Sequence, residues 1–480
     1  MIPLLATELL CEIFACALWD KDADFTSLLD LVAVCHRWRS VALTTPCLWQ
    51  RLVIKGLRAC HVEMAREWFS RAGAFPLTVH VSEHQYDVSA GFPPTFTSFL
   101  KELLRVSSQW EDIALIPCDL LLLPCTPSEL PFDARKLKHL KIAGSILPLS
   151  TSDYFGKVVL ENRLCSIDWS GTVYTSYKIS LLDNSRSSLS TLTCSFDIAD
   201  ASSLILFPNL LNLELHLWSD PDTTSPENVS SLPVVVLKLT GSCVAKSSFI
   251  RHFTCPKVAR LDLGFEDSET MEVSDITFFI TQSHCSLSSL RVAIDAPSRS
   301  EWAKMGNLLL AVRMLPSLHI SFCETPHLSS YPDFPNLPLL RDLRVVQSLS
   351  SCSVTHLIDC VCSPALEELY LEDADCHQTL LFGVLLRRCT NLRILSIIIS
   401  PKTSLFPLLS AIRSGGVWTQ LHTLNVRTRC VDPLFRLLCK RTSCLPALAR
   451  VAARCQEAEP QFADALRAQR AILVSCDIEF

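Results

Sequence analysis

The stretch Leu366-Glu367-Glu368-Leu369-Tyr370-Leu371 holds three leucines, separated first by two residues and then by one. The same spacing of apolar residues returns along the chain, and the middle residues of twelve such units are Leu140, Ile167, Leu192, Leu213, Leu237, Leu261, Leu290, Leu318, Leu343, Leu369, Leu395 and Leu424. Consecutive middle residues lie 21 to 29 positions apart. A period of this length indicates a repeat architecture, in which each unit buries its apolar side against the next.

Within each unit apolar and polar residues alternate, which predicts a short strand. Between the strands the apolar period becomes helical, as in 301–313 and 351–363. Each unit is therefore expected to run strand, turn, helix, turn. Weaker copies of the strand pattern precede the twelve units at 77–81 and 110–115.

Alternating strands and helices would also suit a doubly wound sheet or an eight-stranded α/β barrel. Twelve units exceed eight, and the chain, with only 12 glycines, contains no G-x-G-x-x-G or P-loop sequence. The period therefore favours an α/β solenoid: a horseshoe with parallel strands on its concave face and helices on its convex face.

Composition narrows the classes of function. The net charge of −6 disfavours a nucleic-acid partner. The 23 cysteines include no C-x-x-C pair, so we expect no metal site and no cofactor, but free, buried thiols in a reducing compartment, such as Cys35, Cys194, Cys360 and Cys389. No signal-peptide pattern and no uninterrupted run of 18 apolar residues occur, so we expect a cytoplasmic or nuclear protein without a membrane partner.

The first fifty residues predict a small helical module. An apolar face runs along 7–18, and a second helix is expected over 27–43, with Ser27 and Asp30 as a capping box. Thr45-Pro46 predicts a third helical start, and a strand-like Leu52-Val53-Ile54 follows.

This module resembles the F-box, whose pattern is Leu-Pro-x-Glu-Leu-Leu-x-x-Ile-Phe, then Val-Cys-x-x-Trp-Arg, then Pro-x-Leu-Trp. The matching residues are Leu5, Glu8, Leu9, Leu10, Ile13, Phe14, Val34, Cys35, Trp38, Arg39, Pro46, Leu48 and Trp49. Ala6 stands where the family has proline, in a loop that contributes to partner binding. The whole chain is similar to fungal F-box proteins with irregular leucine-rich repeats, although none of its repeats carries the family's usual asparagine three residues after the third apolar position.

The resemblance implies a substrate-recognition subunit of a Skp–cullin–F-box type ubiquitin ligase. Such a protein binds a Skp-type adaptor, and through it a cullin–RING ligase, while its repeats hold an unknown protein substrate. The implied adaptor-binding residues are Leu5, Glu8, Leu9, Ile13, Val34, Pro46, Leu48 and Trp49. The alternative is a repeat scaffold outside any ligase, with a degenerate F-box that binds no adaptor; Ala6 favours this alternative.

Polar residues on the predicted strands face solvent and are candidates for substrate binding. The strongest are Glu214, His216, Arg260, Arg291, Arg344, Glu368, Tyr370 and Glu372, and Lys141, Asp168, Lys238, Asp262, His319, Asp342 and Arg427 share their orientation. They mix both signs of charge, which suits a protein partner. No G-x-S-x-G or H-E-x-x-H motif is present, so no catalytic residues are assigned and we do not expect an enzyme.

The predicted organisation has four parts. Residues 1–52 form the F-box, 53–130 a linker with irregular first repeats, 131–430 the leucine-rich-repeat solenoid, and 431–480 a helical C-terminal cap. The cap rests on the alanine-rich stretch 445–473.

Overall fold

The computed structural model divides into two compact units, Met1–Trp218 and Ser219–Phe480, so the boundary falls inside the predicted repeat region. Both units are α/β and are built on parallel strands. The structure describes residues 5–18, 24–82, 94–116, 133–143, 163–170, 184–218, 230–264, 271–294, 299–322, 334–347, 357, 361, 363–374, 388–399, 420–428, 450–455 and 475–479.

In the first unit each strand pairs in parallel with the strand that follows it in sequence. The strands are β1 (Arg51–Lys55), β2 (Leu77–Ser82), β3 (Trp110–Ile116), β4 (His139–Ala143), β5 (Ser166–Ser170), β6 (Thr191–Asp197) and β7 (Asn212–Trp218). Leu140 lies opposite Ile167, which in turn lies opposite Leu192. The predicted register is therefore the observed one, and the two weaker copies, as β2 and β3, belong to the same ladder.

The second unit continues the pattern from β9 to β19. Its strands are β9 (Val236–Gly241), β11 (Arg260–Asp262), β12 (Ser289–Ile294), β13 (Ser317–Phe322), β14 (Asp342–Gln347), β15 (Glu368–Ala374), β16 (Ile394–Ile399), β17 (Thr423–Thr428), β18 (Arg450–Cys455) and β19 (Ser475–Glu479). Leu290, Leu318 and Leu343 lie opposite one another. Two short strands, β8 (Ser230–Ser231) and β10 (Phe253–Thr254), pair separately.

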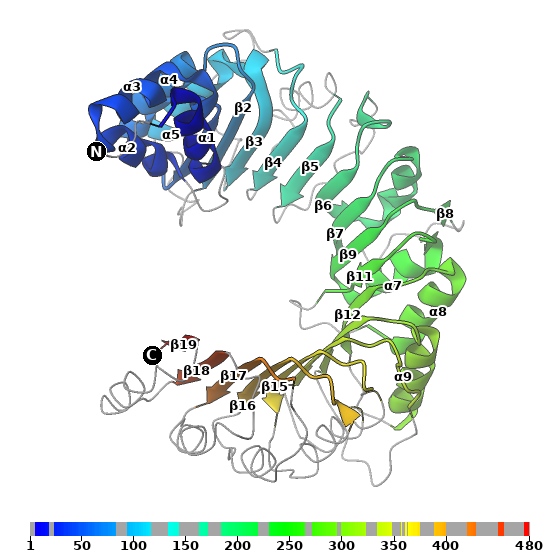
Figure 1. Cartoon of the computed structure of the whole chain (residues 1–480). Coiled ribbons are helices and arrows are strands. Elements are labelled where there is room, and N and C mark those ends of the chain that lie inside the picture. The colour runs from blue at the N-terminus through cyan, green and yellow to red at the C-terminus, as the bar shows by residue number, and fades with distance from the viewer. Residues whose placement is uncertain are drawn as a thin grey trace. The chain divides into compact units, whose positions relative to one another are not determined.

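Helices connect several of these strands. The first unit holds α1 (Thr7–Leu18), α2 (Phe25–Val34), α3 (His36–Thr44), α4 (Cys60–Ala72) and α5 (Pro94–Arg105), with short 3₁₀ segments η1 (Pro46–Trp49), η3 (Ser107–Gln109) and η6 (Ile198–Leu206). The second unit holds α7 (Cys243–His252), α8 (Val273–Ser283) and α9 (Arg299–Ala311), which lie on one face of β9, β11 and β12 (Figure 1). The helix predicted at 301–313 is confirmed as α9, whereas most of 351–363 lies outside the described residues.

The core of each unit lies between the leucines of the strands and the apolar faces of the helices. In the second unit Leu237, Leu290 and Leu318 are almost fully buried, as are Phe279 on α8 and Trp302 on α9. Burying one such side chain contributes about 1.5–3 kcal/mol. The repeated spacing of leucines therefore supplies buried apolar side chains to each of these repeats.

Polar side chains next to the first leucine of a repeat link neighbouring repeats. Asn209 and Asn391 each stand just before the first leucine of a repeat, and their Nδ2 atoms donate to the carbonyls of Ser187 (2.7 Å) and Pro364 (2.8 Å) in the preceding repeat. The Ser288 hydroxyl donates to the carbonyl of Ala259 (2.9 Å) in the same way. These bonds satisfy backbone carbonyls of the turns in a sequence whose repeats have no asparagine three residues after the third apolar position.

The N-terminal helices differ from the prediction in two ways. Helix α1 has the predicted bounds, but the single helix expected over 27–43 is two helices, broken at Cys35, whose backbone is extended. The Cys35 thiol accepts a hydrogen bond from the backbone N–H of Trp38 (3.5 Å) and so begins α3. Helix α2 is capped by Asp24, which accepts from the Thr26 N–H (2.9 Å), and not by Ser27.

The C-terminal prediction is wrong where the structure describes it. Residues 450–455 and 475–479 are the strands β18 and β19 and not part of a helical cap; the remainder of 431–480 lies outside the described residues. Val451 lies opposite Leu424, and Cys476 lies opposite Val451. Pairing with the open edge of β17 satisfies backbone groups, which outweighs the modest helix preference of Ala452 and Ala453.

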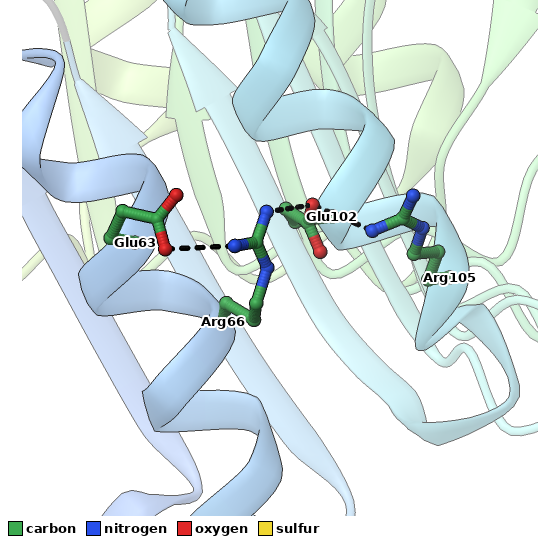
Figure 2. A network of polar contacts seen from close by, with 4 residues as sticks. All are labelled: Glu63, Arg66, Glu102 and Arg105. Carbon is green, nitrogen blue, oxygen red and sulfur yellow. Dashed lines mark hydrogen bonds and ion pairs between the residues drawn. The ribbon is translucent and has the colours of Figure 1, made fainter.

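The segment expected to be a linker with irregular first repeats contains regular elements. It contributes most of β1 and all of α4, β2, α5 and β3 to the first unit. The Glu102 carboxylate on α5 receives bonds from Arg66 on α4 (2.7 Å) and from Arg105 (2.7 Å), and Arg66 also contacts Glu63 (2.8 Å), as Figure 2 shows. The hydrogen bond from Arg66 is the largest influence that lowers the pKa of Glu102. This network joins two consecutive helices.

The cysteines are only partly placed as expected. Cys194, Cys255 and Cys389 are buried, and burial raises the pKa of the Cys194 thiol to about 12. Cys35 is exposed at the break between α2 and α3, contrary to the expectation, and Cys360 lies outside the described residues.

Gly264→Ala tests the close approach of neighbouring repeats. Gly264 has a φ of +66°, and a Cβ there would stand 2.9 Å from the carbonyl oxygen of Leu239. We expect the free energy of unfolding to fall by ~2–3 kcal/mol, because the backbone strain and the clash with the main chain add together. Gly56→Ala is the matched control, because Gly56 also has a positive φ but an added Cβ would meet nothing within 4 Å. Equal losses of thermal stability in the two variants would contradict the close approach.

Glu102→Gln tests the network of Figure 2. The amide keeps the shape of the side chain but weakens two charge-assisted hydrogen bonds, so we expect a loss of about 1 kcal/mol, limited by the solvent exposure of both arginines. Glu63→Gln, at an exposed carboxylate with one arginine partner, should leave stability unchanged. Chemical denaturation monitored by circular dichroism measures both, and equal effects would argue against a special role for Glu102.

Candidate functional site

The N-terminal helices pack together around aromatic side chains. Phe14 of α1 meets Trp38 of α3 edge to face, with ring centroids 4.9 Å apart. Trp49 of η1 meets Trp68 of α4 in the same geometry at 4.7 Å, and its indole N–H donates to the carbonyl of Ala42 (2.8 Å). These contacts join α1 to α3 and η1 to α4, and the N-terminal helices gather beside β2 in the first unit (Figure 1).

One side of α1 turns apolar residues toward solvent. Leu9 and Ile13 lie four residues apart on one side of α1, and Leu5 stands two residues before the helix begins; we call these three residues the apolar stripe. Their exposed fractions lie between 43% and 49%, whereas Leu10 and Phe14 on the adjoining side are buried. Both sides of α1 are therefore apolar, which a helix that only covers a core does not require.

Val34 lies close to the start of this stripe. It is the last residue of α2 and is 59% exposed. Arg37, three residues later, donates a hydrogen bond to the carbonyl of Leu5 and so holds the α2–α3 junction beside the start of α1. Leu29 on α2 is also exposed, and the sequence analysis did not single it out.

The structure divides the predicted adaptor-binding residues into separate groups. Leu5, Leu9, Ile13 and Val34 belong to the exposed apolar region, with Glu8 exposed on α1. Leu48 and Trp49 are only 3% and 4% exposed, so they build the core of the first unit and offer no surface. Pro46 is exposed, but the residue before it, Thr45, contacts Cys11 through its hydroxyl (3.4 Å). Cys11 lies on the side of α1 nearly opposite Leu9, so Pro46 belongs to a separate group.

The predicted substrate-binding residues all point away from the core, as their strand positions require. Each is at least partly exposed, and they fall into both units: Glu214 and His216 lie on β7, and Arg260, Arg291, Arg344, Glu368, Tyr370 and Glu372 lie on β11, β12, β14 and β15. The two on β7 belong to the first unit and the other six to the second.

Four residues on neighbouring strands of the second unit share one row. Arg291 on β12 lies opposite His319 on β13, His319 lies opposite Arg344 on β14, and Arg344 lies opposite Tyr370 on β15. We call Arg291, His319 and Arg344 the cationic row. The Arg344 guanidinium stands 5.9 Å from the centre of the Tyr370 ring, and the Tyr370 hydroxyl donates to Glu372 (3.1 Å).

Carboxylates border the cationic row on two sides. Asp262, on β11, contacts Arg291 with an Oδ2–Nη1 distance of 3.3 Å. Burial raises the pKa of Asp262, and this effect exceeds that of the positive charges of Arg291 and Lys238, which lower it. Asp342 stands 3.7 Å from the Nε of Arg344 and accepts a hydrogen bond from Ser317 (3.0 Å). The two guanidinium groups are thereby held at either end of the row.

His319 occupies the centre of the row. Burial, followed by the positive charges of Arg291 and Arg344, lowers the pKa of His319 to about 4. The imidazole is therefore neutral at physiological pH. Each of the three residues follows the middle leucine of its unit, so the repeat register places them side by side, but the spacing gives no sign of the burial of His319.

Other kinds of site find no support within the described parts of the chain. No group of three or more His, Cys, Asp or Glu side chains lies close enough there to hold a metal ion. No described helix has both the length and the apolar character needed to cross a bilayer.

His319→Gln tests the electrostatic character of the row. The unfolded chain protonates His319 near pH 6.5 but the folded protein only near pH 4, so stability falls as the pH drops from 6.5 toward 4. Removing the imidazole should reduce this loss by up to about 1 kcal/mol at pH 5.5, after allowance for partial exposure. Melting temperatures at pH 7 and 5.5 measure it, with His216→Gln on β7 as control. An unchanged pH dependence in His319→Gln would refute the depressed pKa.

Known proteins add no assignment to these surfaces. No protein-family model matches the chain, and no curated protein sequence is significantly similar to it. The two candidate surfaces, the apolar stripe with Val34 and the cationic row with Tyr370, are therefore identified from their own residues.

Proposed function

We propose that this protein is a substrate-recognition subunit of a Skp–cullin–F-box type ubiquitin ligase. The N-terminal helices act as an F-box and dock onto a Skp-type adaptor, and the leucine-rich repeats form a horseshoe solenoid that holds a protein substrate. The chain forms no covalent bond itself. It brings substrate lysines to high effective concentration near a ubiquitin-loaded enzyme in the cytoplasm or nucleus.

The apolar stripe is the observation that carries this proposal. Three large aliphatic side chains just before and along α1, each close to half exposed, would be costly to leave in water without a partner. An amphipathic helix of a partner could bury them, with Val34 at the margin. The Val-Cys-x-x-Trp-Arg and Pro-x-Leu-Trp motifs support the same interpretation, since Trp38 and Trp49 pack the helices that present the stripe.

The repeats support the second half of the proposal. Strands that pair only in parallel and in one register, with helices on one face where these are described, agree with a leucine-rich-repeat solenoid. The opposite face of the strands carries polar residues of both signs and the Arg344–Tyr370 pair. Arginine and tyrosine are the residues that most often dominate protein interfaces.

A repeat scaffold outside any ligase is the alternative. It is favoured by Ala6, which stands just before α1 where the F-box family has proline and whose carbonyl accepts the backbone hydrogen bond from Leu10 (3.1 Å). A proline would restrict the backbone at this point, and alanine does not. Under this alternative the stripe contacts a different protein and no adaptor binds.

Co-purification with a Skp-type adaptor distinguishes the two functions. We expect the intact chain to form a stoichiometric complex and the double variant Leu9→Asp/Ile13→Asp to lose it, with affinity lowered at least about 100-fold, because two charges would be buried at the interface. The helices should remain folded by circular dichroism, since both positions face solvent.

The matched control is Val244→Asp/Leu310→Asp. These residues are 65% and 58% exposed on α7 and α9, so the same chemical change is made outside the N-terminal helices. Adaptor binding should survive in this variant. A folded, intact chain that does not bind the adaptor would rule out the ligase function and leave the scaffold; equal loss in both double variants would show that the apolar stripe is not the docking surface.

A further inference from the structure

We propose that the cationic row, with Tyr370 beside it, is a binding site for an acidic segment of a protein partner that crosses the strands β12 to β15. This inference names the chemistry of the substrate and so rests on the proposed function. It commits to the anionic side chains of an extended peptide, either carboxylates or phosphates, as the occupant.

The register of the strands is the geometric basis. Arg291, His319 and Arg344 occupy equivalent positions on three adjacent strands, so their side chains leave the same face of the sheet. Adjacent strands are about 4.8 Å apart, which separates the two arginine Cα atoms by ~10 Å. A segment in the extended polyproline II conformation rises about 3.1 Å per residue and returns its side chains to the same side after three residues, so acidic side chains at every third position match the two guanidinium groups.

The charge at the centre of the row is complementary to such a segment. Although Asp262 and Asp342 border the arginines, the depressed pKa of His319 comes from burial and from Arg291 and Arg344. The two arginines therefore contribute positive potential at the imidazole. The same field that disfavours an imidazolium attracts an anion placed above it.

The two arginines are also held in place for this task. Asp262 contacts Nη1 of Arg291, and Asp342 lies beside Nε of Arg344, so each carboxylate fixes its arginine from the side. Arg344 additionally lies against the Tyr370 ring. Arginine side chains that are already ordered lose less conformational entropy when they bind, which favours an anion that approaches from solvent.

The occupant is a protein segment and not a nucleic acid because the charge is confined to a short row. The chain has a net charge of −6, and Glu368 and Glu372 lie on β15 beside Tyr370. A polyphosphate backbone would meet these carboxylates as soon as it extended past the row. A peptide with isolated acidic residues can place its neutral residues there.

Fluorescence anisotropy with defined peptides tests the site. The probe is a labelled Gly/Ser peptide of about ten residues with glutamate at every third position, and its partners carry glutamine or phosphoserine at those positions. We expect the intact chain to bind the glutamate or the phosphoserine peptide at least about tenfold more tightly than the glutamine peptide. The tighter of the two acidic peptides identifies the anion. Preference for a labelled oligothymidine over both would overturn the proposal.

Charge-removing variants locate the binding. Arg291→Gln/Arg344→Gln should weaken acidic-peptide binding at least about tenfold, and Arg344→Gln alone by roughly threefold to tenfold. The single variant guards against misfolding, because Arg291 neutralises the partly buried Asp262 whereas Arg344 is exposed. Arg313→Gln/Arg341→Gln removes the same charge from exposed positions outside the row and should change affinity by less than about twofold.

The outcomes separate this inference from the proposed function. A chain that forms the adaptor complex but does not prefer acidic peptides, or whose binding falls equally in both double variants, overturns the inference and leaves the ligase proposal intact. Peptide binding that depends on Arg291 and Arg344 without any adaptor complex supports the row as an acidic-segment site while removing its role in a ligase.

Discussion

The pairing of short parallel strands is the constraint on which the rest of the structure depends. A strand of about six residues cannot satisfy its own backbone N–H and carbonyl groups, so each repeat requires the strands of the repeats before and after it. Leu290 opposite Leu318, and Leu318 opposite Leu343, show how a single register passes from strand to strand. A slip by one residue would expose these leucines and bury the polar residues beside them.

This register also creates the open polar face. Since side chains alternate along a strand, every leucine that enters the core is followed by a residue on the opposite face. Arg291, His319 and Arg344 are separated in sequence by a full repeat each, yet the ladder makes them neighbours. In α1 the helical period likewise decides which residues are buried. Leu9 and Ile13 lie on the exposed side of the helix, and Leu10 and Phe14 lie on the adjoining, buried side.

The predictions that were wrong share a physical cause, which is that tertiary contacts outweighed local preference. The break at Cys35 interrupts a continuous helical period of apolar residues, and α3 then begins in a position where Trp38 packs against Phe14. The alanine-rich segment around Val451 becomes a strand because the edge of β17 offers backbone partners. Its Leu448-Val451-Ala453 spacing repeats the pattern of the earlier units, a signal that helix propensity obscured.

By itself, the sequence determined the repeat period, the register of the strands and the α/β class, because leucine spacing reports burial directly. The single apolar face predicted over 7–18 did not separate the exposed Leu9 and Ile13 from the buried Leu10 and Phe14. Only the tertiary structure decided that Leu48 and Trp49 are core residues and that burial depresses the pKa of His319. Burial and electrostatic fields depend on how side chains from several elements pack together, and the spacing of residues along the chain does not report that packing.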